Sequence, residues 1–264
     1  MDFFDGKKIR DEVLADLKTK IGTMEQKPVL AVFWIGENQV SGHYVSIKKK
    51  IAEDLGVKFE LIKLDGNASE KEVLDKIEEL NNKPSVKGIM TQIPLPSHLD
   101  QKKIIEAIDS TKDVDGLRYC MGMESAFMPP VVMAILEAIK LSVKKLEDSH
   151  VAVIGHGFLV GAPLVRAING SAKTLAVANS GTEDISDLTL DADIIISATG
   201  SVHIIKSKMV KEGAVLIDAG TSEVSGELKG DIEPEAFKKA SYYTPVPGGV
   251  GPVTIAMLMK NLIG

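Results

Sequence analysis

Cysteine is nearly absent from this chain, since Cys120 is the one thiol in 264 residues. A single cysteine excludes a disulfide within the chain and is typical of a reducing compartment, so we expect a cytoplasmic protein. Histidine is scarce as well: its five residues are scattered, and no two stand at the spacing of zinc ligands. We therefore expect no protein-bound metal.

Long apolar runs and an excess of positive charge are also missing. No run approaches the roughly 18 apolar residues of a membrane helix, and the start MDFFDGKKIR lacks the apolar segment of a secretory signal. The net charge of −6 argues against a nucleic-acid-binding surface. We expect a globular protein with no membrane or nucleic-acid partner. An anionic small-molecule substrate is compatible with this charge, because local charge decides its binding.

What the chain does contain is a regular alternation of apolar stretches with helical patterns, which predicts an α/β fold. The expected strands lie in residues 28–36, 57–64, 86–96, 150–155, 174–180, 192–200 and 213–220, and the expected helices near 6–21, 42–56 and 68–82. The near-continuous apolar strands of the second half predict a parallel sheet covered on both faces. A helix that opens with Pro129 and Pro130 marks a domain change within 120–140, which predicts two α/β lobes around a ligand-binding cleft.

A glycine-rich turn follows the expected strand at 150–155. Gly155, Gly157 and Gly161 lie after a strand and before a helix, where small residues let the backbone approach a pyrophosphate. The spacing is G-x-G-x-x-x-G, not the standard G-x-G-x-x-G, so a turn without a ligand is the alternative. The sequence favours a dinucleotide site.

The next expected strand ends without an acidic residue. An NAD site usually has Asp or Glu there, bonded to the ribose 2′-hydroxyl. This chain has Asn179, Ser180 and Thr182, and Glu183 comes only after a turn. These side chains can donate hydrogen bonds to a 2′-phosphate, so the pattern allows NADP without demanding it.

Tyr44 and Lys48 lie one turn apart on an expected helix and share a face. Alone, the pair is as consistent with two surface neighbours as with catalysis. Gln92 follows an apolar strand in a proline-rich turn, and Asp115 belongs to the stretch KDVDG, where Asp-Gly is a turn dipeptide. Each of these is, by itself, equally a loop residue.

In their order and spacing these motifs closely resemble the FolD family of bifunctional methylenetetrahydrofolate dehydrogenase/cyclohydrolases. The resemblance covers nearly the whole chain and rests on YVSIKKK, GIMTQIPLP, KDVDG, IGHGFLVGAP, ATGSVHII and TPVPGGVGPVTIAMLM, of which the last is the most specific. It implies oxidation of 5,10-methylenetetrahydrofolate with NADP⁺ and hydrolysis of the methenyl product to 10-formyltetrahydrofolate. These reactions belong to one-carbon metabolism, which supplies purine, histidine and methionine biosynthesis.

The resemblance also implies a domain organisation and a homodimer. A catalytic, folate-binding domain would occupy residues 1–119, with residues 247–264 and their helix packing back on it. A Rossmann-type domain that binds NADP would occupy residues 120–246. The substrate bound at this site would be a folate, a small molecule.

The resemblance assigns roles by position. Lys48 would be the central catalytic group, Tyr44 would stack on or orient the folate, Gln92 would hydrogen-bond the lysine, and Asp115 would hold the pterin ring. The folate site would further be lined by Pro94, Gly251 and Pro252. The cofactor would be bound by the glycine-rich turn, the end of the next strand and the stretch ATG: Gly155, His156, Gly157, Val160, Gly161, Asn179, Ser180, Thr182, Thr199 and Gly200.

Hydration of the methenyl carbon needs a proton acceptor. A lysine serves only if burial or nearby positive charge lowers its pKa toward neutrality. We therefore expect Lys48 to lie in such an environment. Lys49 and Lys50 point elsewhere around the helix, so a solvated face or a contact to the folate tail is expected for them.

Two places depart from the family pattern. Many members have Arg-Ser after the first glycine of the turn, where the arginine can meet the 2′-phosphate; this chain has His156 and Gly157. A histidine is charged only part of the time near neutral pH. The family commonly has Pro-Cys-Thr-Pro before the linking helix, where residues 127–132 here read FMPPVV. These differences question the preference for NADP over NAD more than the folate chemistry.

Three other interpretations compete. A short-chain dehydrogenase also combines Tyr-x-x-x-Lys with a glycine-rich turn, but its glycines precede the pair, whereas Tyr44 here precedes Gly155. Another two-lobed dehydrogenase, such as a shikimate-type enzyme, would share the architecture without the PGGVGP ending. A folate-binding protein without catalysis, or with one activity only, is opposed by the presence of Lys48 and Gln92.

Overall fold

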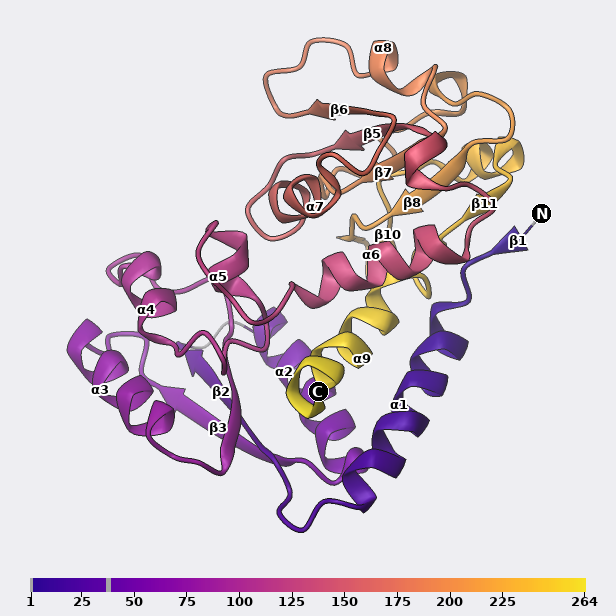
Figure 1. The fold of residues 1–264 in the computed structure, drawn as a ribbon. Coiled ribbons are helices and arrows are strands. Elements are labelled where there is room, and N and C mark those ends of the chain that lie inside the picture. The colour runs from indigo at the N-terminus through magenta and orange to yellow at the C-terminus, as the bar shows by residue number, and fades with distance from the viewer. Residues whose placement is uncertain (1, 37–38) are drawn as a thin grey trace. The chain divides into compact units, whose positions relative to one another are not determined.

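The computed structural model describes residues 2–36 and 39–264, without the side chains of residues 39–41, 43 and 44. The chain forms two compact units. The Lys48 unit comprises residues 11–129 and 258–264, and the Gly155 unit comprises residues 1–10 and 130–257. The division falls within two helices, α1 (Gly6–Gly22) and α9 (Val250–Ile263), both labelled in Figure 1.

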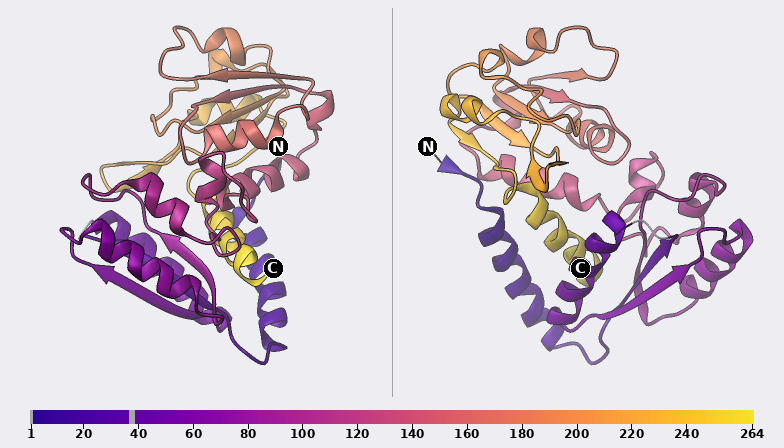
Figure 2. Two further views of the ribbon diagram at one scale, coloured as in Figure 1. Left: turned by 60° about the vertical axis from the view of Figure 1, so that its left-hand side comes forward. Right: turned by 180° about the vertical axis from the view of Figure 1, so that it is seen from behind.

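The Lys48 unit contains a three-stranded parallel sheet in the order β3-β2-β4. Its strands are β2 (Val29–Ile35), β3 (Lys58–Leu64) and β4 (Val86–Thr91), and its helices, besides parts of α1 and α9, are α2 (Gln39–Leu55), α3 (Glu70–Asn81), α4 (Gln101–Ala107) and α5 (Leu117–Cys120). Figure 2 shows these elements from two further sides. Each β–α–β connection supplies the helix that parallel pairing requires.

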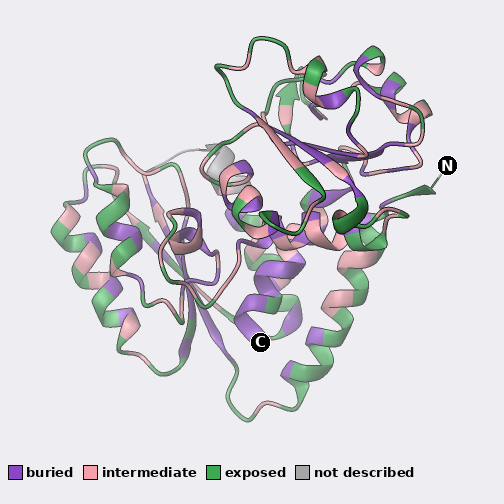
Figure 3. Cartoon of the chain, turned by 45° about the horizontal axis from the view of Figure 1, so that its top comes forward, coloured by how far each residue is buried: buried purple, intermediate pink, exposed green. Residues whose placement is uncertain are grey.

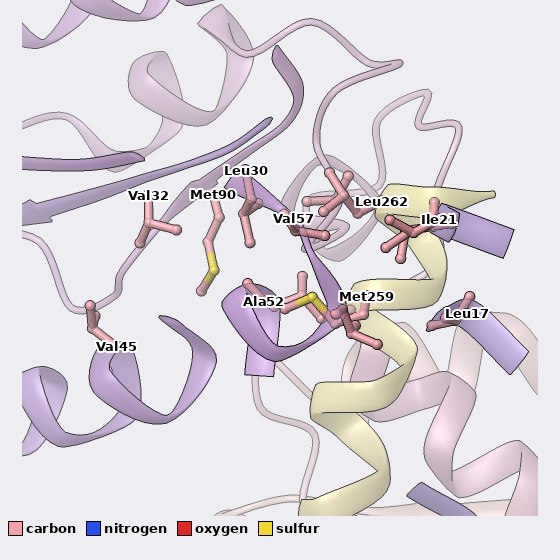
Figure 4. Close-up of a cluster of buried hydrophobic side chains, with 14 residues drawn as sticks. Leu17, Ile21, Leu30, Val32, Val45, Ala52, Val57, Met90, Met259 and Leu262 are labelled. Atoms are coloured by element: carbon pink, nitrogen blue, oxygen red, sulfur yellow. The ribbon is translucent and has the colours of Figure 1, made fainter. Parts of the chain in front are cut away.

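Side chains of β2 alternate between the two faces of this sheet, because successive residues of a strand point to opposite sides. Ala31 and Phe33 pack in a cluster with residues of α3 and α4. Leu30 and Val32 pack in a second cluster with residues of α1, α2 and the end of α9 (Figure 4). The last two turns of α9 therefore complete the core of this unit.

Polar residues begin the covering helices where the sequence indicates. Ser69 precedes α3, and its Oγ accepts the backbone N–H of Glu72 at 3.2 Å, which is the serine half of a capping box. Asp100 precedes α4 and accepts the N–H groups of Lys102 and Lys103. Both helices then turn an apolar side to the sheet and an exposed side outward, seen as purple and green bands in Figure 3.

The Gly155 unit contains a six-stranded sheet in the order β1-β11-β8-β7-β5-β6, and all its pairings are parallel. The strands are β1 (Asp2–Phe3), β5 (His150–Ile154), β6 (Thr174–Ala178), β7 (Ile194–Ser197), β8 (Val215–Asp218) and β11 (Tyr242–Tyr243). The helices are α6 (Pro130–Leu141), α7 (Gly161–Ile168) and α8 (Ser186–Thr189), and an antiparallel hairpin joins β9 (Ser222–Val224) to β10 (Glu227–Lys229). The sequence did not indicate β1, whose pairing with β11 joins the start of the chain to this unit.

The α/β fold and the parallel sheet of the second half are confirmed. Each expected strand contains an observed one, and the stretch 86–96 is a strand only as far as Thr91. Within the described part of the chain, no helix is long and apolar enough to cross a membrane. The same residues include no cluster of three His, Cys, Asp or Glu side chains that could hold a metal ion.

Candidate functional site

Lys48 and Gln92 meet at the carboxyl end of the sheet in the Lys48 unit. Nζ of Lys48, on α2, lies 3.2 Å from Oε1 of Gln92. Gln92 follows β4 directly, and its backbone N–H donates to the carbonyl of Phe33 at 2.9 Å. Its Nε2 donates to the carbonyl of Ile93 at 3.1 Å. The backbone of the turn therefore sets the amide so that its oxygen faces the lysine.

The charge of Asp115 acts on Lys48 across the same site. Burial lowers the pKa of Lys48, and the carboxylate of Asp115 opposes that shift. Burial likewise raises the pKa of Asp115, and the charge of Lys48 opposes that shift. A lysine with a lowered pKa is neutral at a lower pH than a surface lysine, so it can accept a proton from water. The expected environment of Lys48 is present, whereas Lys49 and Lys50 are exposed.

The stretch KDVDG shapes the turn that carries Asp115. Nζ of Lys112 donates to the carbonyls of Leu80, Asn81 and Lys83, at 3.1, 2.6 and 3.0 Å. These carbonyls lie at the end of α3, where a helix lacks acceptor partners of its own. Lys112 therefore ties this turn to α3, a role that the sequence did not indicate.

Asp113 fixes the other side of the turn. It is fully buried, and its carboxylate accepts the N–H groups of Leu117 and Arg118 at the start of α5, at 3.2 and 2.7 Å. Burial raises its pKa to about 6, although these two hydrogen bonds act in the opposite direction. Gly116 has φ 66°, and a Cβ there would lie 2.6 Å from the nitrogen of Pro129. The turn thus requires a glycine after Asp115.

A buried asparagine of α9 is a further residue that sequence reasoning missed. Nδ2 of Asn261 donates to the carbonyl of Val114 at 2.9 Å and to that of Met128 at 3.0 Å. Val114 directly precedes Asp115, so Asn261 fixes the backbone next to the carboxylate. The available signal was a single amide in the stretch MLMKNLI, which is apolar apart from this residue and Lys260, since a buried polar side chain needs partners.

Four residues expected at the folate site are not brought together with Lys48 by the described geometry. The side chain of Tyr44 lies outside the described residues, although its backbone belongs to α2. Pro94 is exposed and follows a cis peptide bond. Gly251 and Pro252 lie in the first turn of α9 and belong to the Gly155 unit. Their assignment to the folate site stays a prediction.

The glycine-rich turn lies at the point of the second sheet where the strand order reverses, between β5 and β7. Open α/β sheets bind ligands at the carboxyl ends of their strands at such a point. A Cβ on Gly161 would lie 1.9 Å from the carbonyl oxygen of Gly155, and one on Gly155 would lie 2.5 Å from that of Ala198. A Cβ on Gly157 would meet nothing within 4 Å. The first and third glycines are therefore required by backbone packing, and the second is not.

This turn fits a dinucleotide phosphate. Val160 precedes α7 and supplies no side-chain hydrogen bond to its first N–H groups. Such N–H groups attract anions. His156 is exposed in the turn, and Thr199 and Gly200 follow β7, the strand beside β5. Gly200 has φ 67° and is exposed, so its backbone can approach a ligand closely.

The end of β6 forms a short turn of its own. Oδ1 of Asn179 accepts the N–H of Gly181 at 2.8 Å, and Oγ1 of Thr182 accepts the N–H of Asn179 at 3.1 Å. Asn179 and Ser180 are exposed. The turn therefore presents an amide and hydroxyls where an NAD site usually has an acid.

Comparison with known proteins shows the family over both units. Residues 4–115 match the family model described as tetrahydrofolate dehydrogenase/cyclohydrolase, catalytic domain, and residues 128–264 match that of its NAD(P)-binding domain. The chain is 40% identical to the bifunctional protein FolD of Clostridium novyi over 268 residues, which cover 98% of this chain and 96% of that protein.

Solved structures give the same result. The bifunctional FolD enzyme of Campylobacter jejuni is 37% identical with a TM-score of 0.94, and the match covers 100% of this chain and 97% of that one. FolD of Trypanosoma brucei, in complex with NADP cofactor and an inhibitor, is 30% identical with a TM-score of 0.90, and the match covers 98% and 95%. The chain belongs to the tetrahydrofolate dehydrogenase/cyclohydrolase family.

Proposed function

We propose that the chain oxidises 5,10-methylenetetrahydrofolate to the 5,10-methenyl compound with NADP⁺ and hydrolyses this product to 10-formyltetrahydrofolate. The observation that carries the proposal is the half-buried pair of Lys48 and Gln92, with the charge of Asp115 acting on the lysine, in a chain of the tetrahydrofolate dehydrogenase/cyclohydrolase family. A lysine with a lowered pKa is the group that hydration requires.

On the folate side, binding and alignment come from few groups. Asp115 holds the pterin ring, whose N–H groups suit a carboxylate acceptor, and Tyr44 stacks on or orients the folate. Pro94, Gly251 and Pro252 line the same site. When bound, NADP⁺ accepts the hydride of the methylene carbon, and this step needs mainly the alignment of two carbons.

Hydrolysis depends on Lys48. The methenyl group is cationic, and its positive charge near Nζ favours the neutral amine further. Neutral Nζ takes a proton from the water that attacks the methenyl carbon, and Oε1 of Gln92 accepts a hydrogen bond from the resulting ammonium at the observed 3.2 Å. The carboxylate of Asp115 then interacts favourably with the positive charge of protonated Lys48. As the hydroxyl oxygen of the adduct forms the formyl C=O and loses its proton, the bond between this carbon and N5 breaks and N5 takes up a proton. Lys48 releases its own proton to solvent, and 10-formyltetrahydrofolate leaves.

On the cofactor side, the backbone of Gly155, Gly157 and Gly161 approaches the pyrophosphate, with Val160 at the start of α7. Thr199 and Gly200, which follow β7, line the cofactor site. Asn179, Ser180 and Thr182 donate to the 2′-phosphate, assisted by His156. We expect NADP⁺ to be preferred over NAD⁺, because the end of β6 has no acidic residue, and an acidic residue there would repel the 2′-phosphate.

The wider setting follows from the family resemblance. We propose that the catalytic domain corresponds to residues 1–119 with 247–264 and the cofactor domain to residues 120–246. The protein is a cytoplasmic homodimer that supplies one-carbon units to purine, histidine and methionine biosynthesis. Sedimentation of the purified chain tests the dimer, for which a mass near 57 kDa is expected from twice the 28.4 kDa of one chain.

The experiment that tests the function measures two rates in one preparation. The first is reduction of NADP⁺ that depends on methylenetetrahydrofolate, and the second is hydrolysis of methenyltetrahydrofolate without any dinucleotide. Both are expected. Folded protein that binds folate without either rate would instead support the binding-protein alternative.

A further inference from the structure

A buried carboxylate lies beneath the turn that follows β7. Asp231 is fully buried, and its Oδ2 accepts the hydroxyl of Ser197 at 2.8 Å. The same oxygen accepts the backbone N–H of Thr199 at 2.7 Å and its hydroxyl at 2.9 Å. Oγ1 of Thr199 in turn accepts the N–H of Ser201 at 3.0 Å. One oxygen thus fixes the end of the strand and the turn after it.

The hydroxyl of Thr199 has one proton, which it donates in its hydrogen bond to Oδ2 of Asp231. Thr199 therefore does not offer a hydroxyl proton to a ligand in this geometry. Its contribution to a cofactor site lies in where its backbone and that of Gly200 stand. That position depends on Asp231, which is 32 residues away in the sequence.

The turn fixed by Asp231 packs against the glycine-rich turn. The carbonyl of Ala198 is the atom that a Cβ on Gly155 would meet at 2.5 Å, and the carbonyl of Gly155 is the one that a Cβ on Gly161 would meet at 1.9 Å. Backbone meets backbone at both contacts, and Cγ2 of Thr199 also lies 3.1 Å from the position of a Cβ on Gly155. A displacement at Ala198 is therefore passed to both required glycines.

Asp231 is itself fixed from the other side. Asp218, buried at the end of β8, accepts the N–H of Asp231 at 3.2 Å through Oδ1 and that of Ile232 at 2.9 Å through Oδ2. A Cβ on Gly230 would lie 2.1 Å from Oδ2 of Asp218, and one on Gly220 would lie 2.0 Å from the carboxyl carbon of Asp231. Both carboxylates are seated on glycine backbone, which leaves them little room to move.

This arrangement is costly for a purely structural contact. Oδ1 of Asp231 is buried and makes no hydrogen bond within the described residues. Desolvating this oxygen without a hydrogen-bond donor costs free energy, so its burial calls for an explanation beyond the turn itself.

We propose that Asp231 is a positioning residue of the cofactor site, whose carboxylate holds the turn at residues 198–201 against Gly155 so that both turns keep the shape that binds NADP⁺. This inference rests on the proposed function and deepens it. Asp231 acts through Ser197 and Thr199 and need not touch the cofactor.

The test compares Asp231→Asn with Asp191→Asn, the same change at an exposed acid of the same unit. In Asp231→Asn the shape is kept and the charge-assisted acceptor is lost, so we expect the Kd of NADP⁺ in calorimetry to rise about tenfold or more. Hydrolysis of methenyltetrahydrofolate by the same preparation needs no dinucleotide and should stay within about twofold of wild type. Folded Asp231→Asn with a wild-type Kd would overturn the proposal.

If Asp231→Asn does not fold, Thr199→Val and Thr199→Ser replace it. Thr199→Val removes the hydroxyl that donates to Asp231 and should raise the Kd of NADP⁺ several-fold, and by more than Thr199→Ser, which keeps the hydroxyl. Equal Kd values for both variants and wild type would overturn the proposal.

Binding of NADP⁺ also separates this proposal from the proposed function. If the wild-type chain binds NADP⁺ and shows no folate turnover, the proposed function fails while the role of Asp231 is still decided by the Kd values. If the wild-type chain binds neither NADP⁺ nor NAD⁺, both fail.

Discussion

The Lys48 unit and the Gly155 unit form their candidate sites from different parts of the chain. In the first, ionisable side chains face one another, and burial shifts the pKa values of Lys48 and Asp115. In the second, the absence of side chains at Gly155 and Gly161 lets backbone meet backbone. The first site should therefore be sensitive to changes of charge at constant shape. The second should, besides the expected effect of Asp231→Asn, be sensitive to added volume at constant charge.

The largest effect is expected for Lys48→Met, which keeps the length of the side chain and removes the amine. Hydrolysis of methenyltetrahydrofolate should fall by about 10²- to 10⁴-fold, the range that general-base groups contribute. Binding of NADP⁺ should persist, because its residues lie in the other unit. Lys49→Met, on the same helix but exposed, is the matched control. Wild-type hydrolysis by Lys48→Met would end the general-base assignment.

A methyl group tests the other unit. Gly161→Ala places a Cβ 1.9 Å from a backbone oxygen and should destabilise the protein by about 3 kcal/mol, with loss of NADP⁺ binding. Gly157→Ala adds the same methyl group in the same turn, where nothing lies within 4 Å. It should leave the thermal melting temperature within about a degree. Equal destabilisation by both variants would contradict the backbone packing described for this turn.

The pH dependence of hydrolysis tests the charge pair. Lys48 acts as a base in its neutral form, so the rate should rise with pH through a pKa that lies below the ordinary value of a lysine. The carboxylate of Asp115 raises this pKa, so Asp115→Asn should lower it further and move the profile to lower pH. The exposed Glu106→Gln should not move it. Rates are taken after subtraction of uncatalysed hydrolysis. If the pH–rate profile of Asp115→Asn stays where it is in wild type, or moves to higher pH, the charges of Asp115 and Lys48 do not interact as described.

The smallest effect is expected at His156. Arginine there provides a permanent charge for the 2′-phosphate, and His156→Arg should tighten NADP⁺ binding by about 1 kcal/mol, or roughly fivefold. The KM for NAD⁺, which lacks that phosphate, is the matched control and should not change. An unchanged KM for NADP⁺ would show that the phosphate is bound by other residues.

The sequence predicted the elements that carry long patterns. Strands such as β2 and β5 have several consecutive apolar residues, and the start of α3 has a serine whose bond to the Glu72 N–H is observed. The two-residue strands β1 and β11 were missed, because two residues carry no periodicity. Their pairing depends on tertiary contact between the two ends of the chain.

The residues of the candidate sites likewise divide into those that the sequence predicted and those that it did not. Lys48, Gln92 and Asp115 were predicted from motifs, and the observed contact of Lys48 with Gln92 agrees with the expected hydrogen bond. Asn261 and Asp231 were missed, since their partners are up to 147 and 34 residues away in the sequence. A buried polar residue signals that partners exist, but the sequence alone does not say which.

The separate chemistry of the two units is tested most directly by assaying Lys48→Met for both hydrolysis and NADP⁺ binding beside wild type. We expect the wild-type chain to reduce NADP⁺ with methylenetetrahydrofolate, to prefer NADP⁺ to NAD⁺, and to hydrolyse methenyltetrahydrofolate. We expect the variant to lose hydrolysis while its Kd for NADP⁺ is unchanged. A folded variant that hydrolyses at the wild-type rate, or that loses NADP⁺ binding together with hydrolysis, would contradict the separate chemistry of the two units.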